Sequence, residues 1–122
     1  PSLAHGQMAG GLVQGLGEAT LERLVYDEDG QLVTASFMDY AIPRADHIPA
    51  LVFGKIETPS PFNPLGAKGI GEAGCVGVPA AIVNAALDAL RPFGVTHLDM
   101  PLTGEKLWSA MRHGMVEEGT KR

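Results

Sequence analysis

Residues 6–17 read GQMAGGLVQGLG, and apolar side chains recur through this stretch at helical spacing as far as Leu24. The spacing predicts a helix over residues 6–24. Each of its five glycines costs such a helix up to ~1 kcal/mol relative to alanine. A chain accepts that cost where its backbone must approach something closely. The pattern leaves two explanations open: packing of another helix against the glycines, or approach of another chain or a flat ligand, with Gln7 and Gln14 offering amide groups.

The segments that follow predict extended structure. Asp27-Glu28-Asp29-Gly30 lies between two short apolar runs, which indicates a hairpin. Residues 37–42 and 51–57 are further strand candidates. Residues 59–71 hold three prolines and three glycines and predict a loop.

The carboxy-terminal half predicts helices. Residues 72–90 form a mostly helical, alanine-rich stretch with Pro79 in the first turn of its main body, and Thr103 opens a terminal helix in which Trp108 belongs to the core. The order of elements predicts an α+β fold, a small mainly antiparallel sheet packed with two to three helices. We expect one domain over residues 1–112 and a polar, frayed tail over residues 113–122.

Composition excludes several classes of function. The chain has 122 residues, 45% of them hydrophobic and 19% charged, with a net charge of −5 and no basic stretch before Lys121-Arg122. Nucleic-acid binding, which needs clustered Lys and Arg, is not expected. The single cysteine, Cys75, excludes an internal disulfide, and no Cys/His spacing predicts a metal site. No apolar run approaches the ~18 residues of a membrane span. We expect a cytoplasmic protein whose amino terminus is a cut inside a longer chain.

Residues 65–74, LGAKGIGEAG, are the second segment that could take part in binding or catalysis. Gly69-x-Gly71-x-x-Gly74 formally matches a dinucleotide fingerprint, although no predicted strand leads into it. Glu72 stands at the predicted helix start with Lys68 close by, where the helix dipole and the ammonium group favour its ionised form. The pattern alone supports three interpretations: a helix cap, a nucleotide motif or a catalytic base.

A third segment, residues 37–43, reads FMDYAIP. Asp39 and Tyr40 could line a site, but an amphipathic strand with a solvated Asp39 explains them better. The four histidines are scattered, and we expect them at the surface.

Taken together, these segments resemble the molybdenum hydroxylase family, which includes xanthine dehydrogenase, aldehyde oxidoreductase and the aerobic carbon monoxide dehydrogenase large chain. The likeness covers roughly residues 6–112, includes Asp99-Met100-Pro101-Leu102-Thr103 as its last motif, and is nearest to carbon monoxide dehydrogenase-like large chains. It implies the carboxy-terminal part of a large subunit's molybdopterin-binding region. The substrate stays open among carbon monoxide, aldehydes, purines and other N-heterocycles.

The resemblance also implies roles for single residues. Glu72 matches the glutamate that deprotonates a hydroxo ligand on molybdenum, and Gln14 matches a glutamine that hydrogen-bonds the pterin. The backbone of Lys68, Gly69, Ile70 and Gly71 matches a stretch beside the ligands of the metal. The family holds molybdenum through the pterin dithiolene, so no protein metal ligands are implied. In bacterial members the cofactor is usually the molybdopterin cytosine dinucleotide.

The implied partners are the remainder of the large subunit and the iron–sulfur and flavin subunits or domains. We expect that the isolated chain neither retains the cofactor nor turns over, and that exposed apolar surface lets it self-associate. The rival hypothesis is a stand-alone, non-catalytic binding or assembly module with the same fold.

Overall fold

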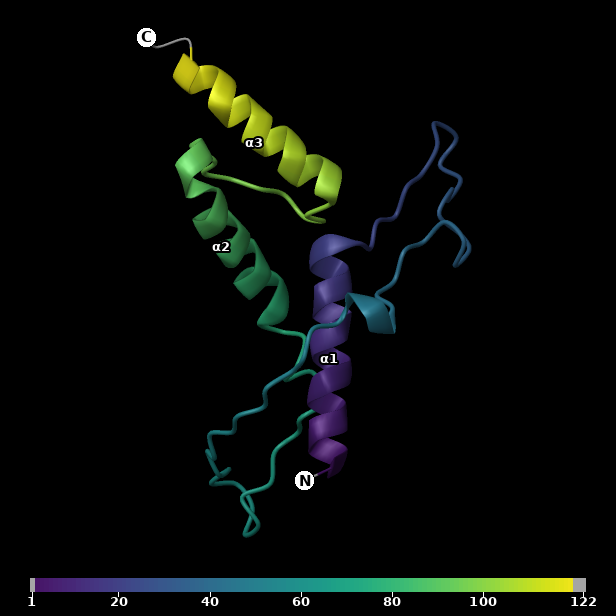
Figure 1. Cartoon of the computed structure of the whole chain (residues 1–122). Helices are drawn as coiled ribbons and strands as arrows, with labels where there is room; N and C mark the ends of the chain where they lie inside the picture. Colours follow the sequence, from purple (N-terminus) through teal and green to yellow (C-terminus); the bar gives the residue numbers. More distant parts are fainter. Residues whose placement is uncertain (1, 120–122) are drawn as a thin grey trace.

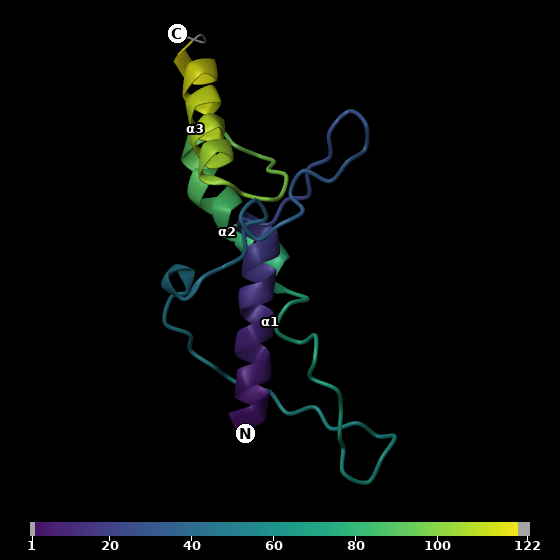
Figure 2. The same cartoon turned by 90° about the vertical axis from the view of Figure 1, so that its right-hand side faces the viewer.

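The computed structural model describes residues 2–119, with side chains as far as His113. Its regular elements are the helices α1 (Ser2–Thr20), α2 (Val78–Leu90) and α3 (Gly104–Gly119), with two short 3-10 turns, η1 (Ala45–His47) and η2 (Arg91–Phe93). In Figure 1, α2 begins beside α1 and leads up towards α3, while the long connection from α1 to α2 extends away from the helices. The turned view in Figure 2 shows the same loops projecting from the helical part.

A helix does form in the predicted amino-terminal stretch, but it spans Ser2–Thr20 and stops four residues before Leu24. Two of its glycines explain how it packs. A Cβ added at Gly11 would lie 3.0 Å from Gly74 Cα, and one added at Gly15 would lie 2.7 Å from Val78 Cβ. These glycines therefore let the segment that opens α2 reach the backbone of α1, which favours helix packing over a flat ligand at this face. Nothing lies within 4 Å of a Cβ at Gly6 or Gly10.

The predicted sheet is wrong. The regular structure of residues 2–119 is helical, and the single strand-like contact is an isolated antiparallel bridge between Tyr26 and Leu32. That bridge closes the predicted Asp-Gly turn, where the Gly30 N–H donates to Asp27 O at 3.1 Å and Gly30 adopts a positive φ of 79°. The hairpin turn is thus confirmed, but within residues 2–119 no strand joins this bridge to make a sheet.

Local hydrogen bonds explain why residues 37–42 do not form a strand. Ser36 O accepts from the N–H groups of both Asp39 and Tyr40, and Ser36 Oγ donates to Asp39 Oδ2 at 2.7 Å. Such side-chain and turn bonds compete with a strand ladder. Residues 51–57 are different: within the described part of the chain, none of their backbone groups pairs with a neighbouring segment. Alternation predicts an extended backbone, but a strand also needs a pairing partner, and none of the described residues provides one for this segment.

The buried apolar part is small: it comprises a residue near the end of α1, the last residue of α2 and a residue of the link before α3. Ala19, Leu90 and Leu102 are its buried apolar residues, and the Leu102 N–H donates to Ala19 O at 2.7 Å. Trp108, expected in the core, is 57% exposed and carries the Arg112 guanidinium over its ring, so that prediction was wrong. Large apolar side chains of the long loops are also exposed, among them Val52, Ile56, Phe62 and Leu65. The predicted self-association would draw on these side chains and stays a prediction.

Two further expectations concern the helices of the carboxy-terminal half. Pro79 does lie in the first turn of α2, but α2 begins at Val78, and residues 71–77 before it form turns. The Thr103 hydroxyl accepts from the Lys106 N–H at the start of α3, as its predicted opening position requires. α3 continues to Gly119, through positions where we expected a frayed tail, and residues 120–122 lie outside the described part.

Within residues 2–119, no helix combines the length and apolar character that crossing a bilayer requires.

A hydrogen bond from Tyr40 to Glu22 fastens the loop after the hairpin to the end of α1, and it makes stability sensitive to alkaline pH. The Tyr40 hydroxyl donates to Glu22 Oε2 at 2.6 Å, and this bond, with some burial and the charges of Glu22 and Glu18, raises the pKa of Tyr40 above 10.0. A pKa raised by folding adds stability that is complete below the unfolded-state pKa and is lost as pH rises through the folded-state pKa. We therefore expect urea unfolding to show the wild type more stable than Tyr40→Phe at pH 8, and the difference to vanish at strongly alkaline pH. Tyr26→Phe is the matched control; a difference between wild type and Tyr40→Phe that does not change with pH would contradict the assignment.

Candidate functional site

Two of the three segments singled out in the sequence meet in space. The Gln7 side-chain amide of α1 donates from Nε2 to Gly71 O at 3.1 Å, joining residues 64 positions apart. One helical turn further along α1, Gly11 touches Gly74 at backbone distance. Because these two contacts lie on one face of α1, the turn that carries Glu72 rests against the amino-terminal half of this helix.

Glu72 is held between two successive turns. The Ala73 N–H donates to Ile70 O at 3.3 Å, which encloses the Gly71–Glu72 peptide. Glu72 O then accepts from the N–H groups of Cys75 (3.0 Å) and Val76 (3.2 Å) and from Cys75 Sγ at 3.3 Å. The Glu72 side chain is exposed and makes no hydrogen bond or ion pair within the described residues. Its main chain is therefore fixed, while its carboxylate is left for an external group.

The expected neighbours of Glu72 need correction. It lies six residues before α2 begins at Val78, so it is not in the first turn of that helix and the expected dipole contact is absent. The Lys68 ammonium donates to Thr58 Oγ1, across the base of the proline-rich loop, and not to Glu72. Lys68 thus closes the loop on itself.

The backbone of residues 68–72 presents a row of unused donors. Within the described part of the chain, none of the five N–H groups from Lys68 to Glu72 donates a hydrogen bond, and all five residues are exposed. Lys68, Gly69 and Ile70 also line an open hollow of about 510 Å³ together with residues of the 56–59 stretch. Consecutive backbone N–H groups without acceptors favour a ligand rich in oxygen atoms.

Gln14 lies on the same side of α1 as Gln7, two helical turns further on. Its side chain is exposed and makes no hydrogen bond with the described residues. The resemblance implies a pterin contact for Gln14 alone, yet Gln7 is the glutamine that contacts the Glu72 turn. The seven-residue spacing was the available signal, because it places both amides on one face.

The third segment does not join the site. Asp39 is exposed and bonded to Ser36, in agreement with a solvated residue, and the Tyr40 hydroxyl donates a hydrogen bond to Glu22 at the other end of α1.

The interpretation of residues 69–74 as a nucleotide motif also loses its support. A Cβ at Gly74 would lie 2.5 Å from Met8 O, so the third glycine of the fingerprint serves packing on α1, and no strand among residues 2–119 leads into the motif.

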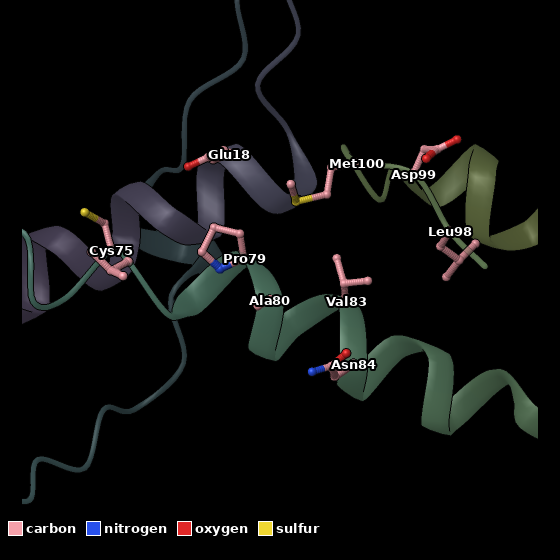
Figure 3. Close-up of a pocket in the computed structure, with 10 residues that line it drawn as sticks. Glu18, Cys75, Pro79, Ala80, Val83, Asn84, Leu98, Asp99 and Met100 are labelled. Carbon is pink, nitrogen blue, oxygen red and sulfur yellow. The ribbon is translucent and has the colours of Figure 1, made fainter. Parts of the chain in front are cut away.

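A further open hollow of about 700 Å³ lies on the side of α2 that faces Leu98, Asp99 and Met100 (Figure 3). Glu18 of α1 and Cys75 complete its wall, but none of the predicted site residues lines it. Within the described residues, no group of three or more His, Cys, Asp or Glu side chains is placed to hold a metal ion.

Comparison with known proteins identifies the family. Residues 1–49 match the model of the molybdopterin cofactor-binding domain. The chain is 45% identical over 117 residues to the nicotine 6-hydroxylase large subunit of Paenarthrobacter nicotinovorans, a match that covers 96% of this chain. The chain belongs to the molybdenum hydroxylase family.

Solved structures of the family have the same fold. Quinoline 2-oxidoreductase from Pseudomonas putida 86 superimposes with a TM-score of 0.86 at 40% identity, covering 92% of this chain. Carbon monoxide dehydrogenase from Oligotropha carboxidovorans superimposes with a TM-score of 0.87 at 35% identity, covering 96%. The chain spans 14% of the length of the nicotine 6-hydroxylase subunit and 14% and 15% of these two solved chains.

Proposed function

We propose that this chain forms part of the molybdopterin site of a molybdenum-dependent hydroxylase and supplies its catalytic base, Glu72. The observation that carries the proposal is the row of unused N–H groups from Lys68 to Glu72, which ends at an exposed carboxylate on a fixed main chain. When bound, the molybdenum–pterin group supplies the two-electron oxidation of a carbon centre. Glu72 accepts the proton that this hydroxylation releases, with its carboxylate as general base.

The cofactor fits the chemistry of these residues. The N–H groups of Lys68, Gly69, Ile70 and Gly71 offer donors to its oxygen atoms, and Gly69 has nothing within 4 Å of its Cβ position that would crowd a flat group. The Gln14 amide, which both donates and accepts, suits the edge of a pterin ring. We include the cytosine dinucleotide form of the cofactor in the proposal.

The rest of the assembly follows from the same proposal. The remainder of a large subunit covers the exposed apolar side chains of the loops, and iron–sulfur and flavin partners carry the electrons away. Residues 1–112 contribute the cofactor-binding domain, residues 113–122 lie outside it, and the enzyme works in the cytoplasm. Without the remainder of the subunit, the isolated chain neither retains the cofactor nor turns over.

A chimera tests the function. The matching 117-residue region of the nicotine 6-hydroxylase large subunit is replaced by this chain, and the purified complex is assayed for molybdenum and nicotine oxidation. We expect a complex that holds molybdenum and oxidises nicotine. A complex that assembles and folds but holds no molybdenum would overturn the proposal and favour a non-catalytic module.

Within this chimera, Gln14→Ala is expected to weaken cofactor retention by about threefold to tenfold, the value of one net hydrogen bond. The measurement is molybdenum per subunit after dialysis. Gln31→Ala, which changes an exposed glutamine in the hairpin, is the control and should retain molybdenum like the parent chimera. Equal retention in Gln14→Ala and Gln31→Ala would remove Gln14 from the site.

A further inference from the structure

We propose that Gln7 is a positioning residue that orients Glu72 through the Gly71–Glu72 peptide. The inference rests on the proposed function, because it gives Gln7 a role only if Glu72 is the base. It starts from the hydrogen bond of 3.1 Å from Gln7 Nε2 to Gly71 O, which links α1 to the residue directly before Glu72.

The planarity of the peptide turns this single bond into control of orientation. The carbonyl of Gly71 and the N–H of Glu72 belong to one rigid plane and point in opposite directions. When Gln7 draws the Gly71 oxygen towards α1, the Glu72 N–H must point away from α1. The donor row of residues 68–72 therefore ends with an N–H directed outward, beside the carboxylate that the same residue carries.

The peptide on the other side of Glu72 is held independently. Glu72 O accepts from the N–H groups of Cys75 and Val76, at 3.0 and 3.2 Å. With both flanking peptide planes fixed, the Cα–Cβ direction of Glu72 is set, and only its side-chain torsions remain free. Gln7 is the one side chain among the described residues that bonds the peptide preceding Glu72, so the orientation depends on it.

The close packing of α1 against the turn places Gln7 level with Gly71 along the helix axis. Gly11 and Gly74 touch, with a Cβ at Gly11 only 3.0 Å from Gly74 Cα. Gln7 lies four residues, about one helical turn, before Gly11, and Gly71 lies three residues before Gly74. The donor and the acceptor of the hydrogen bond are therefore each a short distance along the chain from the same backbone contact. This contact fixes the register, and the amide of Gln7 reaches Gly71 from it.

The test uses Gln7→Met and Gln7→Glu in the chimera, because both nearly keep the side-chain length, and neither a thioether nor an ionised carboxylate can donate a hydrogen bond. We expect kcat to fall about tenfold to a hundredfold, as for a misplaced catalytic group, with KM for nicotine and molybdenum content unchanged. In a Glu72→Gln background, adding Gln7→Met should cause no further fall in the single-turnover rate.

A second measurement is hydrogen exchange of the backbone amides. In the Gln7 variants, exchange at Ala73, Cys75 and Val76 should become about threefold to tenfold faster, with the cofactor bound or removed. Gln31→Met, which removes an exposed amide elsewhere, should change neither kcat nor these exchange rates.

Each alternative gives a different result. Loss of molybdenum in proportion to activity, or a fall in rate that adds fully to that of Glu72→Gln, would make Gln7 a cofactor ligand and overturn the inference. An inactive Glu72→Gln beside an unchanged kcat in Gln7→Met would overturn the inference alone. Full activity in Glu72→Gln would overturn the proposed function, and with it this role for Gln7.

Discussion

Glu72→Gln in the chimera is expected to lower kcat by about 10²–10⁴-fold while molybdenum content stays unchanged. The glutamine amide has nearly the same shape but cannot accept the proton, and loss of a general base costs about this much. The backbone bonds that fix position 72 involve main-chain atoms and the thiol of Cys75, so the substitution leaves them intact. Because the side chain is exposed, stability should change by no more than about 0.5 kcal/mol.

Steady-state and single-turnover oxidation of nicotine, with metal analysis on the same samples, measure this effect. Glu28→Gln removes an exposed carboxylate in the hairpin turn and should keep full activity. Glu72 is not the base if the Glu72→Gln enzyme turns over like Glu28→Gln. A loss of molybdenum that accounts for the loss of rate would instead make Glu72 a cofactor-retaining residue.

Gly74→Ala is expected to destabilise the fold by about 1–3 kcal/mol, the cost of forcing an extra carbon into a packed contact. The added Cβ would lie 2.5 Å from Met8 O and 3.0 Å from Gly11 Cα, and both are backbone atoms that cannot rotate away. The φ angle of Gly74 is not positive, so alanine is strained here only by the contact. The turn must move off α1, and it takes the Glu72 peptide with it.

Gly77→Ala is the matched control, because nothing lies within 4 Å of its Cβ position and its φ of −95° suits alanine. Urea unfolding of both variants should show Gly77→Ala within about 1 kcal/mol of the parent. In the chimera, Gly74→Ala should also lose kcat, whereas Gly77→Ala should not. Equal stability of the two variants would mean that α1 and the turn are not packed at backbone distance.

Local signals in the sequence predicted the local structure. Helical spacing located α1, Pro79 located the first turn of α2, and the Asp-Gly pair located the turn at Gly30. The sheet failed because a strand depends on a partner far away in the sequence, and alternation shows only which residues would face one side. Around Ser36, the bond from its hydroxyl to the Asp39 carboxylate and the backbone bonds to its carbonyl form a local turn in place of a strand.

The sequence singled out candidate residues for the site but not how they are arranged. Resemblance to the family singled out Glu72 and residues 68–71, and the structure places them on one exposed segment. The helix start was misplaced because Gly74 and Gly77 weaken the first turns of the predicted helix, and the chain forms separate turns there. The bond from Gln7 to Gly71 spans 64 residues, and no short-range pattern encodes such a contact.

The contact between Gly11 and Gly74 also bears on the order in which the chain folds. Five glycines leave α1 a poor helix by itself. The residues whose packing stabilises α1 lie more than sixty positions later in the sequence. A long loop must therefore close before this packing can stabilise the helix. α1 and the turn that carries Glu72 should therefore become ordered in the same late step of folding.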